Sequence, residues 1–410
     1  MPNRRAVIQG ILGLGVAAGT RVLLPGMAWG CERLRDAQGD GSAGGSGLLE
    51  ALPGKWPLIR RTRRPPNFET PLSHFNDWLT PNRAFYVRYH GAVIPEIDGR
   101  EWRLRIGGPS VQRPLELTRE ELRRDFEWVE VVAVNQCSGN RRGLFEPRVP
   151  GVQWGYGAMG NARWRGVRLG DLLRRAGLGK SAVEVVFQGA DSPVLPGTPD
   201  FVKSLPLPKA LHEDTLVALE MNGEPLPHWH GAPARLVVPG WTATYWMKHL
   251  TAIEVVAQPC DSFWMQTAYR IPKGAFPAGE RFDSQDTGVT SPITEILINS
   301  VITNLEDGAH FSFGQQIEVK GIAWDGGHGI REVAVSLDEG RSWRPAELEP
   351  DRGRYAFRPW VYRFTPGTKG GHSLWAKARS RGGETQGPTL IANPAGYHHN
   401  RVQRLGIMVG

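Results

Sequence analysis

The sequence predicts an α+β region followed by an all-β sandwich, and two contrasts along the chain support this prediction. Before about residue 284, short β-branched runs alternate with stretches of helical periodicity, and after it the helical signal disappears. The later region has short alternating apolar and polar runs between Gly- and Pro-containing turns, which is typical of an immunoglobulin-like β-sandwich. At 410 residues and 40% apolar content, the chain is long enough for two cores.

Local patterns predict the elements of the first region. Thr118–Leu122 begins a helix with a capping box, and Val167–Ala176 is an amphipathic helix that Gly177 ends. Alternating or β-branched runs predict strands at 102–106, 129–134, 183–187 and 234–238.

The sandwich is predicted from residue 285 to residue 410. Its alternating runs predict strands at 317–319, 333–337, 355–357 and 374–376. Leu337–Trp343 contains Asp-Glu-Gly-Arg-Ser, which indicates a hairpin turn.

Residues 1–30 are predicted to be an export signal. Arg4-Arg5 precedes an apolar, glycine-rich segment, and Ala28-Trp29-Gly30 resembles a small-x-small cleavage site. The paired arginines favour the twin-arginine route and a periplasmic location. An uncleaved membrane anchor and a lipoprotein signal at Cys31 remain alternatives.

Residues 31–79 are predicted to be a linker and an N-terminal extension, with a flexible Gly- and Ser-rich stretch from Asp36 to Gly47. Beyond the signal there is no run of about 18 apolar residues, so we expect no membrane segment after signal removal. The net charge is +8, but no nucleic-acid-binding signature accompanies it, so we expect no nucleic acid partner. A basic surface, or sites for small oxyanions, fits the charge better.

The most informative motif is Asn135-Gln136-Cys137-Ser138-Gly139-Asn140-Arg141-Arg142. A thiolate is a soft ligand for transition metals, and nearby guanidinium groups favour the thiolate. The chain has only three cysteines and no CxxC pair, which excludes a zinc ribbon and a cysteine-ligated iron–sulfur cluster. A metal at Cys137 would therefore take most other ligands from a cofactor. The alternative is a buried structural thiol, which is the more common role of an isolated cysteine.

Further motifs follow in a specific order. They are Arg88-Tyr-His90, the Gln136–Arg142 loop, and His230-Gly-Ala-Pro-Ala-Arg235 followed by Val238-Pro-Gly240. In this order they resemble the sulfite oxidase family of molybdopterin enzymes, and the resemblance extends from about Thr80 through Asn393–Tyr397 to the end. It implies a molybdopterin-binding catalytic domain at 80–284 and an immunoglobulin-like dimerisation domain at 285–410.

The resemblance also implies roles for individual residues. Cys137 would bind molybdenum. Arg88 and Arg142 would line the substrate pocket, Tyr269 would hydrogen-bond substrate or the metal's oxygen, and Arg358 would reach in from the sandwich. The residues that would hold the pterin and its phosphate are Tyr86, His90, Asp191, His230, Arg235, Trp246, Met247 and Lys248.

The implied activity is oxidation of sulfite to sulfate at a molybdenum–molybdopterin (Mo-MPT) centre. The chain has no cytochrome b5-like haem segment, so electrons would pass to an external c-type cytochrome, and we expect a homodimer or a heterodimer with a cytochrome subunit. No lysine lies between Cys137 and Trp164, which counts against the activities of animal sulfite oxidases and nitrate reductases.

Two alternatives remain open. One is a sulfane dehydrogenase subunit of the thiosulfate-oxidising system, which shares the fold and cofactor but usually has a longer C-terminal tail. The other, from a different class, is a cofactor-free periplasmic binding protein built on the immunoglobulin-like domain. A methionine sulfoxide reductase of the same superfamily is disfavoured, because it would lack the sandwich.

Overall fold

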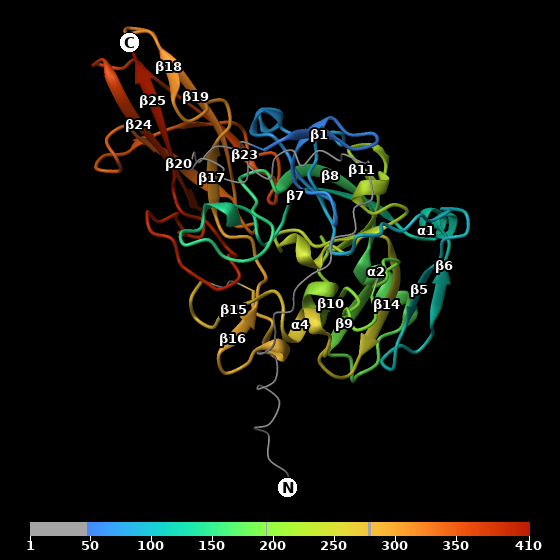
Figure 1. Cartoon of the computed structure of the whole chain (residues 1–410). Coiled ribbons are helices and arrows are strands. Elements are labelled where there is room, and N and C mark those ends of the chain that lie inside the picture. Colours follow the sequence, from blue (N-terminus) through green and yellow to red (C-terminus); the bar gives the residue numbers. More distant parts are fainter. Residues whose placement is uncertain (1–46, 194, 278–279) are drawn as a thin grey trace, which may run out of the picture. The chain divides into compact units, whose positions relative to one another are not determined.

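The computed structural model describes residues 47–193, 195–277 and 280–410. The predicted export signal and nearly all of the predicted Gly- and Ser-rich linker lie outside the described residues. The described residues all belong to one compact unit. The described part of this unit is rich in strands (Figure 1), and its α-helices are short: α1 Arg119–Asp125, α2 Leu169–Ala176, α3 Leu207–Ala210 and α4 Phe263–Gln266.

The N-terminal extension forms a small antiparallel sheet that delivers the first predicted site residues. The sheet has the order β1 (Leu49–Ala51), β2 (Pro57–Thr62), β3 (Asn67–Glu69), β4 (Val87–Arg88). Phe68 pairs with Val87 and both are fully buried. Tyr89 and His90 follow directly after β4, as expected for a strand that enters a turn.

The central sheet positions the cysteine motif. Its order is β12 (Glu224–Pro225), β11 (Leu216–Met221), β8 (Met159–Arg168), β7 (Trp128–Gln136), with β13 (Arg235–Val237) also paired to β11. The antiparallel ladder between β7 and β8 extends from the Trp128–Val167 pair to the Gln136–Met159 pair. The β-branched run therefore forms a strand, and Cys137 is the first residue beyond it.

Both longer helices, α1 and α2, lie on connections between the central sheet and a second sheet. Its order is β10 (Val202–Pro206), β9 (Glu184–Gly189), β14 (Leu250–Val256), β5 (Leu104–Gly107), β6 (Leu115–Leu117). The capping box of α1 is confirmed, because Thr118 and Glu121 each accept a hydrogen bond from the other's backbone N–H. Gly177 ends α2 with φ of +75°, a conformation that glycine adopts at low cost. The predicted start of this helix at Val167 is wrong, because Val167 and Arg168 continue the β8 ladder.

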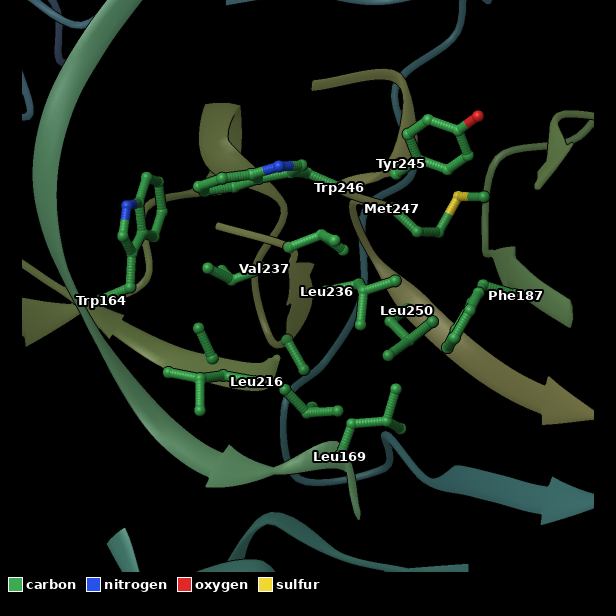
Figure 2. Close-up of a cluster of buried hydrophobic side chains, with 14 of the residues drawn as sticks. Trp164, Leu169, Phe187, Leu216, Leu236, Val237, Tyr245, Trp246, Met247 and Leu250 are labelled. Carbon is green, nitrogen blue, oxygen red and sulfur yellow. The ribbon is translucent and has the colours of Figure 1, made fainter. Parts of the chain in front are cut away.

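The core of this first region packs these sheets together. Figure 2 shows its centre, where aliphatic residues such as Leu169, Leu216 and Leu250 lie beneath the indole of Trp246. The Trp164 and Trp246 rings meet edge to face with centroids 5.5 Å apart. The indole rings close the apolar core on the side where β13 and the following loop carry predicted cofactor residues.

The C-terminal region is a two-sheet sandwich, drawn in orange and red in Figure 1. One sheet has the order β17 (Asn299–Ile302), β19 (Ile317–Trp324), β23 (Arg358–Phe364), β22 (Glu347–Leu348). The other has the order β18 (Ala309–Phe311), β25 (Gln403–Val409), β24 (Gly370–Ser380), β20 (Ile330–Ser336), β21 (Arg344–Pro345). A short ribbon of β15 (Arg270–Pro272) and β16 (Thr290–Pro292) precedes the sandwich.

Alternation in these strands matches the observed burial. Leu374 and Ala376 of β24 are fully buried on either side of a more exposed residue, as the pattern predicted, and the alternation continues to Ala378. The hairpin at 337–343 connects β20 to β21. The predicted strand at 355–357 is wrong: the backbone of Tyr355 bonds to Val134 of β7, and β23 begins only at Arg358.

In the part of the chain that the structure describes, none of the helices has the length and apolar character needed to span a lipid bilayer.

Candidate active site

The loop after β7 holds the Cys137 thiol in a defined place. The Cys137 N–H donates to the carbonyl of Ala158 at 2.9 Å, and the Asn140 side-chain oxygen accepts from the Ala158 N–H at 3.0 Å. Arg141 has φ of +68°, which turns the chain sharply at the end of the loop. Cys137 is a free thiol and is 7% exposed.

Cys137 faces a cavity of about 560 Å³, which we call the cysteine cavity. The structure brings four of the five predicted catalytic residues to its wall: Arg88, Cys137, Arg142 and Tyr269. No Asp or Glu is among the described residues that line it. The cavity therefore combines one thiol with two guanidinium groups and no opposing carboxylate.

Arg142 is held at the wall by backbone and aromatic contacts. Its Nε donates to the carbonyl of Ala395 at 2.8 Å, and its guanidinium lies 5.2 Å from the centre of the Tyr397 ring. Gly139 leaves room for it, because a Cβ at that position would lie 2.5 Å from the guanidinium. The glycine of the cysteine motif thus accommodates its second arginine.

Tyr269 is fixed between the cavity and the core. Its φ is +57°, its ring stacks on Tyr397 with centroids 5.5 Å apart, and its hydroxyl is hydrogen-bonded to Nε2 of His90. Burial raises the pKa of Tyr269, although the positive charges of Arg88 and Arg142 oppose the shift. The hydroxyl is therefore protonated at neutral pH and can donate a hydrogen bond.

A second cavity of about 60 Å³ adjoins the first, and we call it the cationic cavity. All the predicted cofactor residues except Cys137 line it: Tyr86, His90, Asp191, His230, Arg235, Trp246, Met247 and Lys248. Arg88 and His90 line both cavities, which places the two side by side.

The cationic cavity concentrates buried positive charge. Lys248 donates to the carbonyls of Trp229 and Arg88 at 2.8 and 3.1 Å, and Arg235 donates to the carbonyls of His230 and Trp246, both at 3.1 Å. Burial lowers the pKa of Lys248 well below its usual value and that of Arg235 to about 10. Asp191 also lines the cavity, and its charge favours the protonated form of Lys248, but within the described residues it forms no ion pair with either cation. One carboxyl group faces Lys248, Arg235 and Arg88, so an anionic ligand would complement the remaining positive charge.

Donors without partners point the same way. Asn135 lines the cavity, and its side-chain oxygen accepts a hydrogen bond from the hydroxyl of Tyr86 at 2.6 Å. Its amide nitrogen has no partner among the described groups. Nε of Arg235 is likewise unpaired. Because buried donors are normally satisfied, these residues fit a bound group rich in acceptors. A pterin with a phosphate is such a group, and Cys137 in the adjoining cavity supplies a soft metal ligand.

His90 and Asp191 differ from the surrounding cations. Burial and the charges of Arg88, Lys248 and Lys203 lower the pKa of His90 well below its usual value, so its imidazole is neutral. It stacks on Phe201 with centroids 3.9 Å apart. Burial raises the pKa of Asp191. His90 therefore adds no positive charge to the cavity, and Asp191 is the acidic side chain among its described lining residues.

The expected position of Arg358 is wrong. Its Nε donates to the carbonyl of Glu349 at 2.7 Å and its Nη1 to the carbonyl of Ile330 at 2.9 Å, and it lines neither cavity. These backbone acceptors inside the sandwich occupy the guanidinium. The sandwich region instead reaches the cysteine cavity through Pro394, Ala395 and Tyr397.

The sandwich also holds the cysteine loop from behind. Trp324 Nε1 donates to the side chain of Gln136 at 2.6 Å. Arg141 donates to the side-chain oxygen of Asn299 at 2.6 Å and to the carbonyl of Arg401 at 2.8 Å. The two arginines of the motif thus have different surroundings: Arg142 faces the cavity, and Arg141 joins the loop to the sandwich.

Several lining residues escaped the sequence prediction. Asn135 lies two residues before Cys137, and its place in the motif could have revealed it. Tyr397 ends the Asn393–Tyr397 segment that formed part of the family resemblance, but no role was assigned to it. Three further lining residues occupy ordinary aromatic or polar positions without a local motif: Asn67, Phe201 and Trp264.

Comparisons with known proteins agree with this geometry. Residues 90–264 match the oxidoreductase molybdopterin binding domain, and residues 290–400 match the Mo-co oxidoreductase dimerisation domain. Sulfite oxidase of Arabidopsis thaliana is 32% identical over 317 residues, which cover 74% of this chain and 79% of that protein. The chain belongs to the sulfite oxidase family. As a member of the family, it takes a Mo-MPT cofactor, and the prediction of an α+β cofactor domain followed by an immunoglobulin-like sandwich is confirmed.

Other family members extend the comparison. Mitochondrial sulfite oxidase of Rattus norvegicus is 36% identical over 321 residues, which cover 76% of this chain but 57% of that protein. The chain therefore spans a little over half the length of this relative. The crystal structure of the sulfane dehydrogenase SoxCD from Paracoccus pantotrophus aligns with a TM-score of 0.72 at 25% identity, covering 84% of each chain.

Proposed function

We propose that this protein oxidises sulfite to sulfate at its Mo-MPT centre and passes the electrons to an external c-type cytochrome. The observation that carries the proposal is the cysteine cavity, in which Cys137 lies beside Arg88 and Arg142. The described lining residues of this cavity include no carboxylate. Such a wall attracts a small oxyanion and brings it to the metal ligand. The name of the Arabidopsis relative supports the same substrate.

The two arginines would bind sulfite through charge-assisted hydrogen bonds. Each such bond has a net value of roughly 1.5 to 3 kcal/mol. Sulfate is also an anion, so these arginines concentrate and orient the substrate but do not by themselves favour the reaction. When bound, the Mo-MPT group supplies the oxygen-transfer and two-electron redox chemistry at Cys137.

Tyr269 and His90 would organise the rest of the pocket. The protonated Tyr269 hydroxyl is placed to donate to an oxygen of the substrate, and the neutral His90 fixes its direction. Overall, sulfite and water give sulfate, two protons and two electrons. A one-electron cytochrome must therefore be reduced twice per turnover.

We further propose that the protein works in the periplasm after twin-arginine export and that its sandwich mediates a dimer. The match of residues 290–400 to a dimerisation domain supports the second point. A heterodimer with a cytochrome subunit is the alternative assembly. Gel filtration of the exported protein with light scattering distinguishes these states.

The first experiment measures sulfite-dependent reduction of ferricytochrome c by molybdenum-loaded protein. Cys137→Ala should abolish reduction, and Cys260→Ala should keep it, since Cys260 is the other described free thiol and lines neither cavity. Ferricyanide serves as a second acceptor. A fully loaded protein that reduces neither acceptor with sulfite would sink the sulfite proposal.

Sulfane dehydrogenase activity is the second candidate, because the SoxCD structure shares the fold over most of both chains. A sulfane donor tested with the same acceptors separates the two. Turnover with the sulfane donor and none with sulfite would favour this candidate.

A further inference from the structure

Lys55 reaches the cofactor region from outside the segment that matches the molybdopterin binding domain. It lies between β1 and β2, in the N-terminal extension, and is 8% exposed. Its ammonium nitrogen contacts the carbonyls of Asn82 at 2.6 Å and Phe85 at 2.8 Å, and Nε2 of His230 at 2.5 Å. An ammonium group has three N–H donors, and this site offers three acceptors.

These contacts define the state of His230. In its charged form Lys55 directs two protons at carbonyls and the third at Nε2, which requires a lone pair there and places the imidazole proton on Nδ1. Nε2 also makes a longer contact of 3.4 Å with the carbonyl of Asn82. The edge-to-face contact with Phe85, with centroids 5.2 Å apart, fixes the plane of the ring. Within the described residues Nδ1 makes no hydrogen bond, and His230 lines the cationic cavity. A donor held in this way suits an anionic or acceptor-rich ligand.

We propose that Lys55 is a positioning residue for the cofactor: it orients His230 and sets its tautomer. This proposal rests on the placement of His230 in that cavity and is independent of whether sulfite is the substrate. It assigns a role in the site to the N-terminal extension.

The burial of Lys55 without a counter-charge supports a role beyond packing. Within the described residues Lys55 has no carboxylate within 4 Å, and burial lowers its pKa well below the usual value. A buried cation without a counter-charge destabilises a fold. An anion bound in the adjacent cavity would favour the charged form, which links the lysine to the ligand rather than to the fold alone.

The test compares Lys55→Met with Lys209→Met. Lys209 is also buried, but its ammonium pairs with Glu280 at 2.9 Å and lies over the Trp241 ring, and none of these three residues lines either cavity. Pterin and molybdenum content per chain, and the rate of pterin loss from the loaded protein, are measured for each variant. Lys55→Met should lose pterin roughly 10- to 100-fold faster, the usual effect of removing a group that orients a ligand residue. Lys209→Met should lose pterin at the wild-type rate.

Thermal unfolding of the cofactor-free proteins separates folding from ligand retention. The proposal fails if Lys55→Met retains pterin like the wild type. It also fails if Lys209→Met loses pterin as fast as Lys55→Met while the two cofactor-free variants have the same unfolding temperature.

A double variant tests whether Lys55 acts through His230. In a His230→Gln background, Lys55→Met should change the rate of pterin loss by less than twofold. Fully multiplicative effects would overturn the positioning role. The ¹⁵N spectrum of histidine-labelled protein, with His230→Gln for assignment, should show His230 protonated on Nδ1 in the wild type and a mixed tautomer in Lys55→Met. A His230 protonated on Nε2 in the wild type would also refute the proposal. None of these measurements depends on turnover, so failure of the sulfite assignment would leave them readable.

Discussion

The hydroxyl of Tyr269 and Nε2 of His90 are hydrogen-bonded across the boundary between the two cavities. Tyr269 lines the cysteine cavity, and His90 lines both. This single bond therefore connects the place proposed for the substrate with the place proposed for the pterin.

Tyr269→Phe should lower kcat/KM for sulfite roughly 10- to 100-fold, because one preorganised donor to the substrate is lost. Molybdenum content should stay near one per chain, since Cys137 is untouched. Steady-state kinetics and metal analysis test both points. Tyr245→Phe is the matched control, because the Tyr245 hydroxyl is buried, has no partner among the described groups and lines neither cavity. Equal kinetics for Tyr269→Phe and wild type would contradict the assigned role.

Gly139→Ala should raise KM for sulfite roughly tenfold with little change in stability. The new Cβ would lie 2.5 Å from the Arg142 guanidinium, which can move only by leaving its place at the cavity wall. KM and the unfolding midpoint are measured together. Gly367→Ala provides the control, since its Cβ would meet nothing within 4 Å. An unchanged KM in Gly139→Ala would show that the position of Arg142 does not control sulfite binding.

Arg141→Met should destabilise the fold by about 1 to 3 kcal/mol, because it leaves the Asn299 side chain and the Arg401 carbonyl without their buried donor. Chemical denaturation measures this change. Arg100→Met, at an exposed position paired with Asp98, should have little effect. A double-mutant cycle with Asn299→Ala should show coupling, and strict additivity would mean that the Arg141–Asn299 contact does not stabilise the junction.

Stability should rise between pH 7 and pH 9, and Lys203 should contribute to this rise. Lys203 is buried over the Tyr245 ring, and burial lowers its pKa to about 7. The unfolded chain, with an ordinary lysine pKa of about 10.4, then binds more protons than the folded chain in this window. The stabilising contribution is present above the unfolded pKa and is lost as the pH falls through about 7.

Denaturant unfolding at pH 7 and pH 9 checks this contribution. Lys203→Met should reduce the difference in unfolding free energy between the two pH values, whereas Lys180→Met, at an exposed position, should leave it as in the wild type. A difference that Lys203→Met does not change would assign the pH dependence to other groups.

Features with a local cause were predictable from sequence. The capping box at Thr118, the helix end at Gly177 and the alternation in β24 each depend on residues a few positions apart. The same holds for the loop after β7, whose residue types already indicated a thiol beside guanidinium groups. For the ordered motifs, the family resemblance added the roles that local chemistry could not supply.

The direction of Arg358 was not predictable in this way. Arg358 begins its strand, and its guanidinium donates to the carbonyls of Ile330 and Glu349. Neither acceptor is a near neighbour of Arg358 in the sequence, so no local pattern could indicate these contacts. Whether an arginine reaches a cavity or bonds to the backbone depends on which acceptors packing brings near it. The same reason explains why Lys55, in an extension with no recognisable motif, was missed.

The chemistry of the site was readable in the residues themselves: a soft thiol ligand at Cys137, guanidinium groups for an oxyanion, and cations for a phosphate. Their division into two adjoining cavities was not. That division depends on contacts across long stretches of sequence, such as His90 with Tyr269, Arg141 with Asn299 and Lys55 with His230. Covalent structure determines which groups can bind, and only packing of the sheets and the sandwich determines which of them meet.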